Sequence, residues 1–340
     1  MRYPLFLRKG GSIGCIAPSF GCTISPYREN LLRACQQFSA EGYKVICGEN
    51  CFADVGIGKS NTAKSCADEI NRFFTDSRAD ILISCGGGET MCEDLSYVDF
   101  SSIGSVSPKW FMGYSDNTNL TFLLPTLCDT AAIYGPNITA FGTDNRHVSI
   151  DDAWDLLMGI KMTVDSYDGW EKDHLKSPED PYAGYNITEP YKQISFPSDE
   201  IFISGRLIGG CLDVLSVLCG TRFDKVREFA EKYADDGIIW FLEACDLNPM
   251  GMRRALWQLK EAGWFSHVKG FLFGRPMHFY EQMMGADRIN SVTDILTDYD
   301  VPILMDLDIG HLPPMMPLIS GAFAEIRSDG TSLNVKHILR

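Results

Sequence analysis

A serine between a predicted strand and a predicted helix could act as a nucleophile. Ser115 lies in the run FMGYSDNT at residues 111–118. A small residue before a serine at such a junction permits the tight turn of a nucleophile elbow, which lifts the hydroxyl above the sheet edge. The following helix would point its first N–H groups, beginning with that of Asp116, at a developing oxyanion. The same pattern is also typical of a simple helix cap, and Asn117 replaces the second glycine of the G-x-S-x-G elbow.

Three consecutive glycines follow the predicted strand at residues 80–84. Their backbone N–H groups could bind a phosphate or a carboxylate, or form half of an oxyanion hole. Gly86, Gly88 and the adjacent Glu89 are therefore candidate substrate contacts. Neither the Walker A spacing nor GxGxxG is present, which disfavours a nucleotide-dependent enzyme. The alternative is that the glycines only form a strained turn.

A serine nucleophile needs a base, and the base needs an orienting acid. Of the six histidines, His311 directly follows the apolar strand predicted at residues 301–307 and lies in a rigid Gly- and Pro-containing loop. His278 follows another strand in a similar way and is the competing candidate. Glu243 ends the apolar run IIWFLE, where an ionised carboxylate is costly without a partner. It could instead cap the next helix or pair with Arg253.

The elements that must position these residues alternate between strands and helices. This alternation over residues 1–165 predicts an α/β fold whose N-terminal domain contains a doubly wound, mostly parallel sheet. Ligands collect at the C-terminal ends of the strands in such sheets, which is where Ser115 lies. The predicted strands of this domain are at residues 12–17, 43–47, 80–84, 109–114 and 131–134.

The pattern changes in the second half of the chain. Residues 166–200 are polar and rich in Pro, Tyr and Asp, so we expect a linker or a loop that covers substrate. Trp170 and Tyr182 are candidates there for substrate contact or for surface packing. Residues 201–340 predict a smaller α/β domain with a mixed sheet and a terminal hairpin that turns at residues 329–330.

Composition restricts the class of protein. The 30 basic and 45 acidic residues give a net charge of -15, which would repel a phosphate backbone, so nucleic acid is an unexpected partner. The 12 cysteines form no CxxC pair, which argues against a zinc knuckle and favours reduced thiols in the cytoplasm. No signal peptide or membrane span is evident. We therefore expect a soluble cytoplasmic protein.

Together these motifs resemble the LD-carboxypeptidase and microcin-immunity family of serine peptidases. The resemblance covers nearly the whole chain, and it depends on the order and spacing of the motifs more than on any one of them. The segments that carry it are at residues 7–10, 17–19, 86–88, 113–116, 205–210, 220–221, 243, 274–275, 310–311, 317–318 and 321.

The resemblance implies a catalytic triad of Ser115, Glu243 and His311. It also implies oxyanion donors at the N–H groups of Gly87 and Asp116. Family members are typically homodimers, and they use no metal or cofactor. The implied substrates are the L,D-amide before the terminal D-alanine of a murein tetrapeptide or, as the alternative, the amide of a peptidyl aminoacyl-nucleotide antibiotic. A non-catalytic protein that binds a small ligand is the other hypothesis.

Two positions depart from the family pattern. Cys211 replaces the asparagine that commonly follows the Gly-Gly pair, and Leu312–Met316 is unusually apolar and proline-rich. Both could reshape the pocket without removing the triad. The long segment around Trp170 resembles the microcin-immunity branch more than the compact murein-recycling enzymes.

Overall fold

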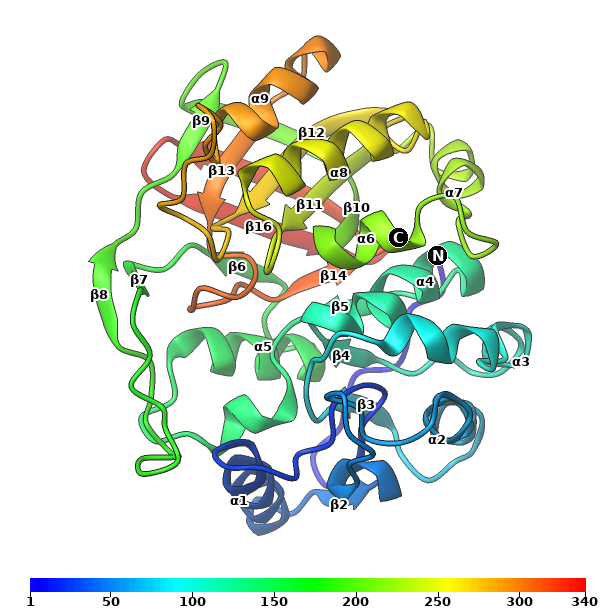
Figure 1. The fold of residues 1–340 in the computed structure, drawn as a ribbon. Coiled ribbons are helices and arrows are strands. Elements are labelled where there is room, and N and C mark those ends of the chain that lie inside the picture. Colours follow the sequence, from blue (N-terminus) through cyan, green and yellow to red (C-terminus); the bar gives the residue numbers. More distant parts are fainter.

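The computed structural model describes residues 1–340 and contains two main sheets, one above the other in Figure 1. The first sheet has the strand order β14-β5-β4-β3-β1-β2. Its first five strands along the chain are parallel, and β14 joins β5 antiparallel. The predicted doubly wound, mostly parallel sheet is thus confirmed. The strands are β1 (Ser12–Ile16), β2 (Lys44–Cys47), β3 (Ile81–Ser84), β4 (Phe111–Gly113), β5 (Ala132–Tyr134) and β14 (Leu318–Ser320).

Helices cover both faces of this sheet. Thr62 caps α2 by accepting a hydrogen bond from the Ser65 N–H, and one side of α2 is buried through residues such as Ile70 and Phe74. Helix α4 is buried on nearly every side because it lies between β5 of the first sheet and β10 of the second. The helices of this half are α1 (Tyr27–Ala40), α2 (Ala63–Thr75), α3 (Phe100–Ser105), α4 (Thr118–Cys128) and α5 (Val148–Met158). Short 3-10 helices are η1 (Glu49–Phe52), η2 (Met91–Ser96), η3 (Ser115–Asn117), η4 (Ile138–Gly142) and, later, η5 (Thr297–Tyr299).

The second sheet is mixed, as predicted, with the order β6-β16-β15-β10-β11-β12-β13-β9. The pairs from β10 to β13 are parallel, whereas the outer pairs are antiparallel. The expected terminal hairpin is formed by β15 and β16. The strands of the second sheet are β6 (Thr163–Asp165), β9 (Ile194–Phe196), β10 (Glu200–Cys211), β11 (Ile238–Glu243), β12 (Val268–Gly274), β13 (Ile303–Leu307), β15 (Phe323–Asp329) and β16 (Leu333–Ile338). The helices are α6 (Leu212–Leu218), α7 (Val226–Lys232), α8 (Pro249–Glu261) and α9 (Asn290–Leu296).

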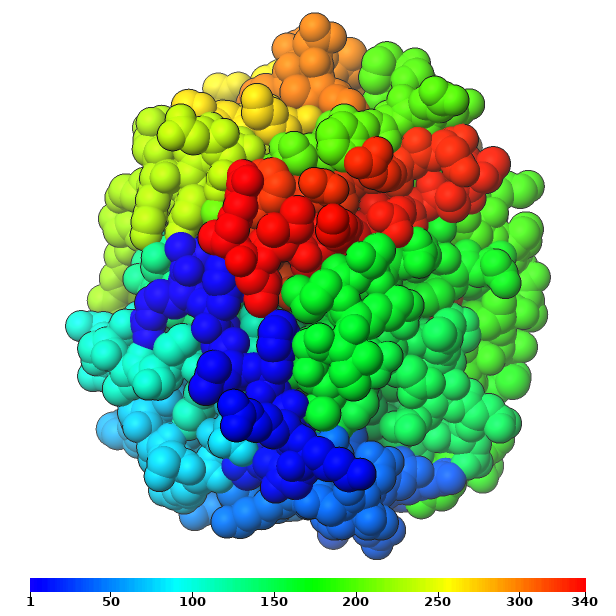
Figure 2. All heavy atoms as spheres, turned by 180° about the vertical axis from the view of Figure 1, so that it is seen from behind, coloured from blue at the N-terminus to red at the C-terminus, as the bar shows by residue number.

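The two halves of the chain are interleaved. Strand β14 comes from the last quarter of the sequence but belongs to the first sheet, and the largest buried apolar cluster contains side chains from both sheets. Seen from behind, the N-terminal segment lies against the C-terminal one, where the Tyr3 hydroxyl donates to the Arg340 carbonyl at 3.0 Å (Figure 2). The division into residues 1–165, 166–200 and 201–340 stays a prediction, and the two halves share a core.

The middle segment has more regular structure than its sequence indicates. Strands β7 (Gly169–Glu171) and β8 (Ile187–Pro190) form a separate antiparallel pair at one edge of the molecule (Figure 1). These strands are too short to produce a readable alternation, which is why the sequence suggests an unstructured loop. No helix of the structure has both the length and the apolar character needed to cross a membrane.

Candidate active site

Three side chains far apart in the sequence meet at the strand ends of the two sheets. The His311 Nε2 atom lies 2.9 Å from the Ser115 Oγ atom. The His311 Nδ1 atom lies 2.9 Å from the Glu243 Oε2 atom. Ser115 follows β4, Glu243 is the last residue of β11, and His311 lies in the loop after β13. The structure thus brings together the serine, the base and the acid that the sequence proposes.

Ser115 occupies a sharp turn between β4 and α4. Its φ angle is 63°, in the left-handed region that a residue with a side chain seldom adopts. Gly113 must be small here, since a Cβ atom would lie 2.9 Å from the Asn117 side chain. This strained strand-to-helix turn is typical of a nucleophile elbow, and it directs the hydroxyl toward His311.

The glycine turn after β3 lies directly against the serine. A Cβ atom on Gly87 would be 3.1 Å from the Ser115 Oγ atom, so a larger residue here would press on the serine side chain. The Phe20 N–H donates to the Gly87 carbonyl at 2.8 Å and fixes the orientation of the turn. The Gly87 N–H donates to no backbone carbonyl and is available to a ligand. Gly87 therefore lies beside the Ser115 hydroxyl, and its N–H stays a candidate oxyanion donor.

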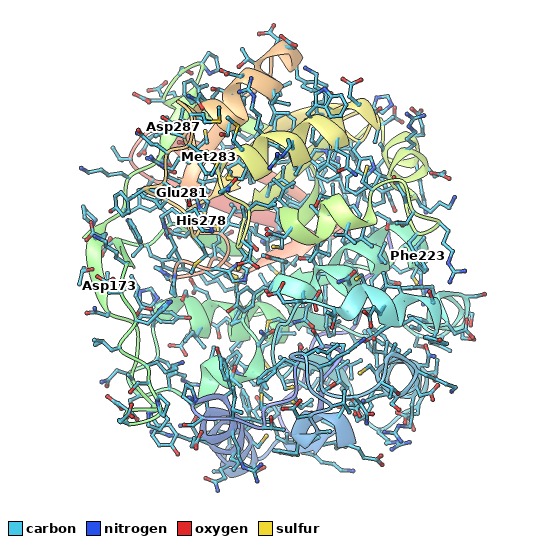
Figure 3. All side chains as sticks on the ribbon, in the orientation of Figure 1. Asp173, Phe223, His278, Glu281, Met283 and Asp287 are labelled. Atoms are coloured by element: carbon cyan, nitrogen blue, oxygen red, sulfur yellow. The ribbon has the colours of Figure 1, made fainter.

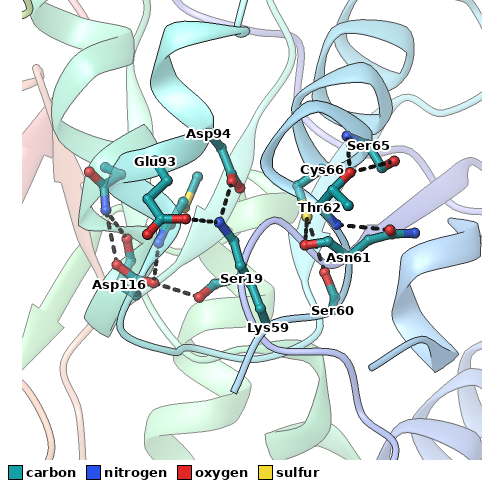
Figure 4. A network of polar contacts seen from close by, with 12 residues as sticks. Ser19, Lys59, Ser60, Asn61, Thr62, Ser65, Cys66, Glu93, Asp94 and Asp116 are labelled. Atoms are coloured by element: carbon teal, nitrogen blue, oxygen red, sulfur yellow. Dashed lines mark hydrogen bonds and ion pairs between the residues drawn. The ribbon is translucent and has the colours of Figure 1, made fainter. Parts of the chain in front are cut away.

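The Asp116 side chain anchors the base of this turn. Its carboxylate accepts hydrogen bonds from the Ser19 hydroxyl and from the Met91 N–H (Figure 4). Burial raises the pKa of Asp116, although both hydrogen bonds act in the opposite direction. Nearby, the Lys59 ammonium is 3.1 Å from the Asp94 carboxylate. These contacts tie three loops together under the Ser115 turn and occupy the Asp116 side chain.

Glu243 is buried and has two partners. The Tyr134 hydroxyl donates to its Oε1 atom at 2.5 Å while His311 contacts the other oxygen. Burial alone would raise the pKa of Glu243, but His311 and Tyr134 lower it overall. In return, Glu243 outweighs the effect of burial on the imidazole and raises the pKa of His311. Gly310 has a φ of 101°, and a Cβ atom there would lie 2.6 Å from Oε2, so only glycine can precede the histidine.

The loop that carries His311 joins the two sheets. It begins after β13 of the second sheet and ends at β14 of the first. At its start the buried Asp308 carboxylate accepts from the Arg275 guanidinium and from the Tyr167 N–H. Loss of either partner of this buried ion pair would leave an uncompensated charge in the interior. The pair therefore holds the start of the loop in place.

A cavity of about 590 Å³ opens above Ser115 and His311. This volume is within the usual range for a site that takes a small molecule. The predicted contacts Gly86, Gly88 and Glu89 line it together with Gly87. Pro313 and Met315 also line it, so the apolar stretch at residues 312–316 does form part of the wall. Its aromatic lining residues are Phe20, Tyr27, Tyr114 and Tyr185.

The middle segment forms one wall of the cavity, but Trp170 lies elsewhere. Trp170 is 5% exposed and packs against Phe279, with the Arg275 guanidinium over its ring. Its predicted contact with substrate is therefore not supported, whereas the next residue, Glu171, lines the cavity. Successive side chains of a strand point to opposite faces, so a one-residue difference on β7 decides between core and cavity. Tyr182 stacks under Arg33 and is also absent from the lining.

Charged groups in the cavity are of both signs. Lys176 is the single lysine or arginine in the lining, and burial lowers its pKa. Glu171 pairs with His174 and raises the pKa of that imidazole. Burial raises the pKa of Glu89, and the nearby Asp246 and Asp116 act in the same direction. The cavity thus offers one ammonium group and carboxylates to a polar ligand.

The competing sequence interpretations do not fit this geometry. His278 pairs with Glu281 at 2.7 Å on the loop before α9, beside Met283 and Asp287 (Figure 3). Arg253 pairs with Asp294, not with Glu243. Asn248 caps α8 through the Gly251 N–H, so Glu243 is not needed there.

Sequence reasoning missed several residues of the site. Tyr134 ends β5, next to the strand that carries Ser115, and the rule that ligands gather at strand ends could have drawn attention to it. Lys176 and Tyr185 had no such signal, because they lie in a segment without periodicity. Cys211 donates through its N–H to Thr118 and through its thiol to Asp213, and it does not line the cavity.

The fold and site define a two-sheet α/β protein with a serine at a nucleophile elbow. Family models match most of the chain: the LD-carboxypeptidase N-terminal domain over residues 13–135 and the LD-carboxypeptidase C-terminal domain over residues 204–326. The chain therefore belongs to the LD-carboxypeptidase family.

Two curated relatives match almost from end to end. A Vibrio cholerae protein with a provisional carboxypeptidase name is 24% identical over 350 residues, covering 99% of this chain and 98% of the relative. The microcin C7 self-immunity protein MccF of Escherichia coli is 24% identical over 340 residues, covering 97% and 94%.

Solved structures share the fold. An MccF-like protein from Bacillus anthracis has a TM-score of 0.82 at 23% identity, covering 99% of this chain and 100% of the other. MccF in complex with aspartyl sulfamoyl adenosine has a TM-score of 0.78 at 21% identity, covering 99% of both chains.

Proposed function

We propose that this protein is a serine-type hydrolase of amide bonds with Ser115, His311 and Glu243 as its triad. The observation that carries the proposal is the line of two 2.9 Å contacts from the Ser115 hydroxyl through the imidazole to the Glu243 carboxylate. Ser115 and His311 line a cavity, and Gly87 lies beside the Ser115 hydroxyl in its wall. A helix cap alone would need neither the imidazole nor the buried carboxylate.

In the proposed reaction, His311 Nε2 takes the proton of Ser115 as its Oγ atom attacks the substrate carbonyl. The N–H groups of Gly87 and Asp116 then stabilise the oxyanion. His311 donates its proton to the leaving amine, which departs and leaves an acyl-serine. Water enters, is deprotonated by His311 and hydrolyses the acyl group by the reverse sequence.

Glu243 acts on the base, not on the substrate. Its carboxylate holds the imidazole with a proton on Nδ1, so that Nε2 faces the serine, and it stabilises the imidazolium that forms. The Tyr134 hydroxyl holds the carboxylate in turn. Because the raised pKa of His311 keeps the imidazole protonated at lower pH, we expect activity to rise toward the alkaline side.

We propose a murein tetrapeptide as the first substrate, with release of its terminal D-alanine. The name of both matching domain families supports this choice. A carboxypeptidase has to recognise a free carboxylate, and Lys176 is the lining cation that could do so. The carboxylates of Glu89 and Glu171 could accept an ammonium group of the same zwitterionic substrate.

A peptidyl aminoacyl-nucleotide is the second candidate, and the middle segment favours it. This segment supplies Lys176 and Tyr185 to the cavity, which could bind a phosphate and stack on a base. MccF, similar to this chain over almost its full length, has been solved with an aspartyl sulfamoyl adenosine. We further propose a cytoplasmic homodimer that requires no cofactor; sedimentation of the purified protein tests the dimer.

A side-by-side assay separates these functions. Purified protein should release D-alanine from murein tetrapeptide, or the amino-acyl nucleotide from a peptidyl-nucleotide analogue, and Ser115→Ala should abolish whichever activity is found. A fluorophosphonate should label the wild type at Ser115 only. Retained activity in Ser115→Ala would refute the triad, and absence of both labelling and turnover would leave the binding protein as the correct hypothesis.

A further inference from the structure

Half of the cysteines of the chain gather in one place away from the triad. They come from β1, β2, α1, η1 and the loops that follow β1 and β3, toward the end of the first sheet opposite β14. All 12 cysteines are free thiols, so none of this cluster is already cross-linked. The members of this thiol cluster are Cys15, Cys22, Cys35, Cys47, Cys51 and Cys85.

Two pairs of sulfur atoms in the thiol cluster are in direct contact. Cys35 Sγ lies 3.7 Å from Cys47 Sγ, and Cys51 Sγ lies 3.7 Å from Cys15 Sγ. The Cys15 thiol also interacts with those of Cys47 and Cys85. Two cysteines of the thiol cluster are accessible in part, because Cys35 and Cys47 are half-buried while the other four are fully buried. A reagent from solvent would therefore meet the Cys35–Cys47 pair first.

Thiols in contact can bind a soft metal ion or form a disulfide. No group of three or more His, Cys, Asp or Glu side chains in the structure is arranged to hold a metal ion. The pairwise contacts at 3.7 Å instead suit a disulfide, whose sulfur atoms are about 2.05 Å apart. Cys35 lies on α1, and Cys47 is the last residue of β2. To form the bond, rotation of the two side chains has to shorten the distance between the sulfur atoms by less than the length of one C–S bond.

We propose that Cys35 and Cys47 are a site of reversible oxidation by hydroperoxides, which converts the two thiols to a disulfide. Cys47 attacks first: its thiolate bonds to one peroxide oxygen, the O–O bond breaks, and the other oxygen leaves as hydroxide or alkoxide and takes up a proton. The resulting Cys47 sulfenic acid is then attacked by the Cys35 sulfur, which loses its proton. The S–O bond breaks, water leaves, and two electrons have passed from the two thiols to the peroxide.

The surroundings of the two thiols favour this order of attack. The neighbouring thiols of Cys15, Cys35 and Cys51 lower the pKa of the Cys47 thiol by more than burial raises it. Its hydrogen bond to Cys47, together with burial, raises the pKa of Cys35. The thiolate is the nucleophile in such reactions, so the cysteine with the lower pKa reacts with peroxide and its neighbour resolves the product.

The test uses the reduced full-length protein and hydrogen peroxide. Titration of the denatured protein with a thiol reagent should fall from twelve thiols to ten, and dithiothreitol should restore the count. Trypsin should then yield residues 34–44, which contain only Cys35, linked to residues 45–59. Further cleavage after Glu49 separates Cys47 from Cys51 and identifies the bonded sulfur. This readout does not depend on catalysis, so it is independent of the proposed hydrolase function.

Variants give a second test. Cys35→Ala should abolish the linked peptide, whereas the matched control Cys219→Ala, which removes a half-buried thiol with no cysteine neighbour, should leave it unchanged. If Cys35→Ala fails to fold, the linked peptide of the wild type still tests the proposal. A thiol count that stays at twelve, or a first cross-link that lacks Cys35 or Cys47, would overturn the proposal.

Discussion

The proposed catalytic centre and the wall of the cavity are built from different kinds of structure. Ser115, Glu243 and His311 lie at the ends of strands from both large sheets, and the Glu243 side chain is fully buried. The facing wall comes from residues 166–200, where most side chains are exposed or half-buried around a two-stranded pair. Large packed sheets hold reacting atoms precisely, whereas an exposed segment tolerates substitution. We infer that the chemistry is fixed by the sheets and that the substrate is selected by the segment.

The strongest test of this contrast removes the nucleophile. Ser115→Ala should lower kcat by roughly four to six orders of magnitude, because the hydroxyl that forms the covalent bond is lost. The melting temperature should stay close to that of the wild type, since alanine keeps the Cβ atom and the backbone strain of this turn and removes only the hydroxyl. Steady-state kinetics and thermal unfolding check the two expectations. A large loss of stability together with the loss of activity would mean that the residue is structural.

Glu243→Gln should have the next largest effect. The amide can present its NH₂ group to His311 and favour the wrong tautomer, so we expect a decrease in kcat of about 10³- to 10⁴-fold. The carboxylate raises the pKa of His311, and its loss should therefore move the acidic limb of the pH–kcat/KM profile to lower pH. A pH profile that keeps its acidic limb in place would contradict the assigned role. Glu281→Gln, at the histidine–glutamate pair of His278, is the control and should leave the profile unchanged.

Tyr134→Phe should have a smaller effect of the same kind. It removes the hydroxyl that donates to Glu243 at 2.5 Å but keeps the buried ring. A lost hydrogen bond to a charged group costs roughly 1.5–3 kcal/mol, which corresponds to about a 10- to 100-fold decrease in kcat. KM should change little, since the hydroxyl faces the acid and not the cavity. An increase in KM with unchanged kcat would show instead that Tyr134 contacts substrate.

Substitution in the cavity wall should give the opposite pattern. Lys176→Met removes the lining ammonium group, so KM should rise roughly tenfold while kcat stays within about twofold. Lys172→Met is the matched control, because Lys172 is exposed in the same segment and does not line the cavity. Comparison of the two proposed substrates shows which anionic group Lys176 binds. If Lys176→Met lowered kcat as much as Tyr134→Phe does, the inference that the sheets fix the chemistry and the segment selects the substrate would be wrong.

The sequence predicted the centre better than the wall for a physical reason. Each proposed triad residue lies at the end of a buried strand or in the loop after one, and buried strands leave apolar runs that are easy to recognise. Trp170 was misplaced because β7 has three residues, too few to show which side faces the core. Lys176 lies in a segment whose apolar residues show no periodic pattern. Strand β14 could not be assigned to the first sheet, since its partner β5 is nearly 200 residues earlier in the chain and nothing local specifies that pairing.

The path of the loop that carries His311 has a consequence for biosynthesis. This loop is anchored at β13 in one sheet and at β14 in the other, so its shape depends on pairing with strands made long before it. Ser115 is synthesised long before the base, and the loop that carries the base is anchored only when β14 pairs with β5. Under the proposed function, a truncated chain that ends before residue 318 should therefore lack hydrolytic activity although it contains Ser115 and His311.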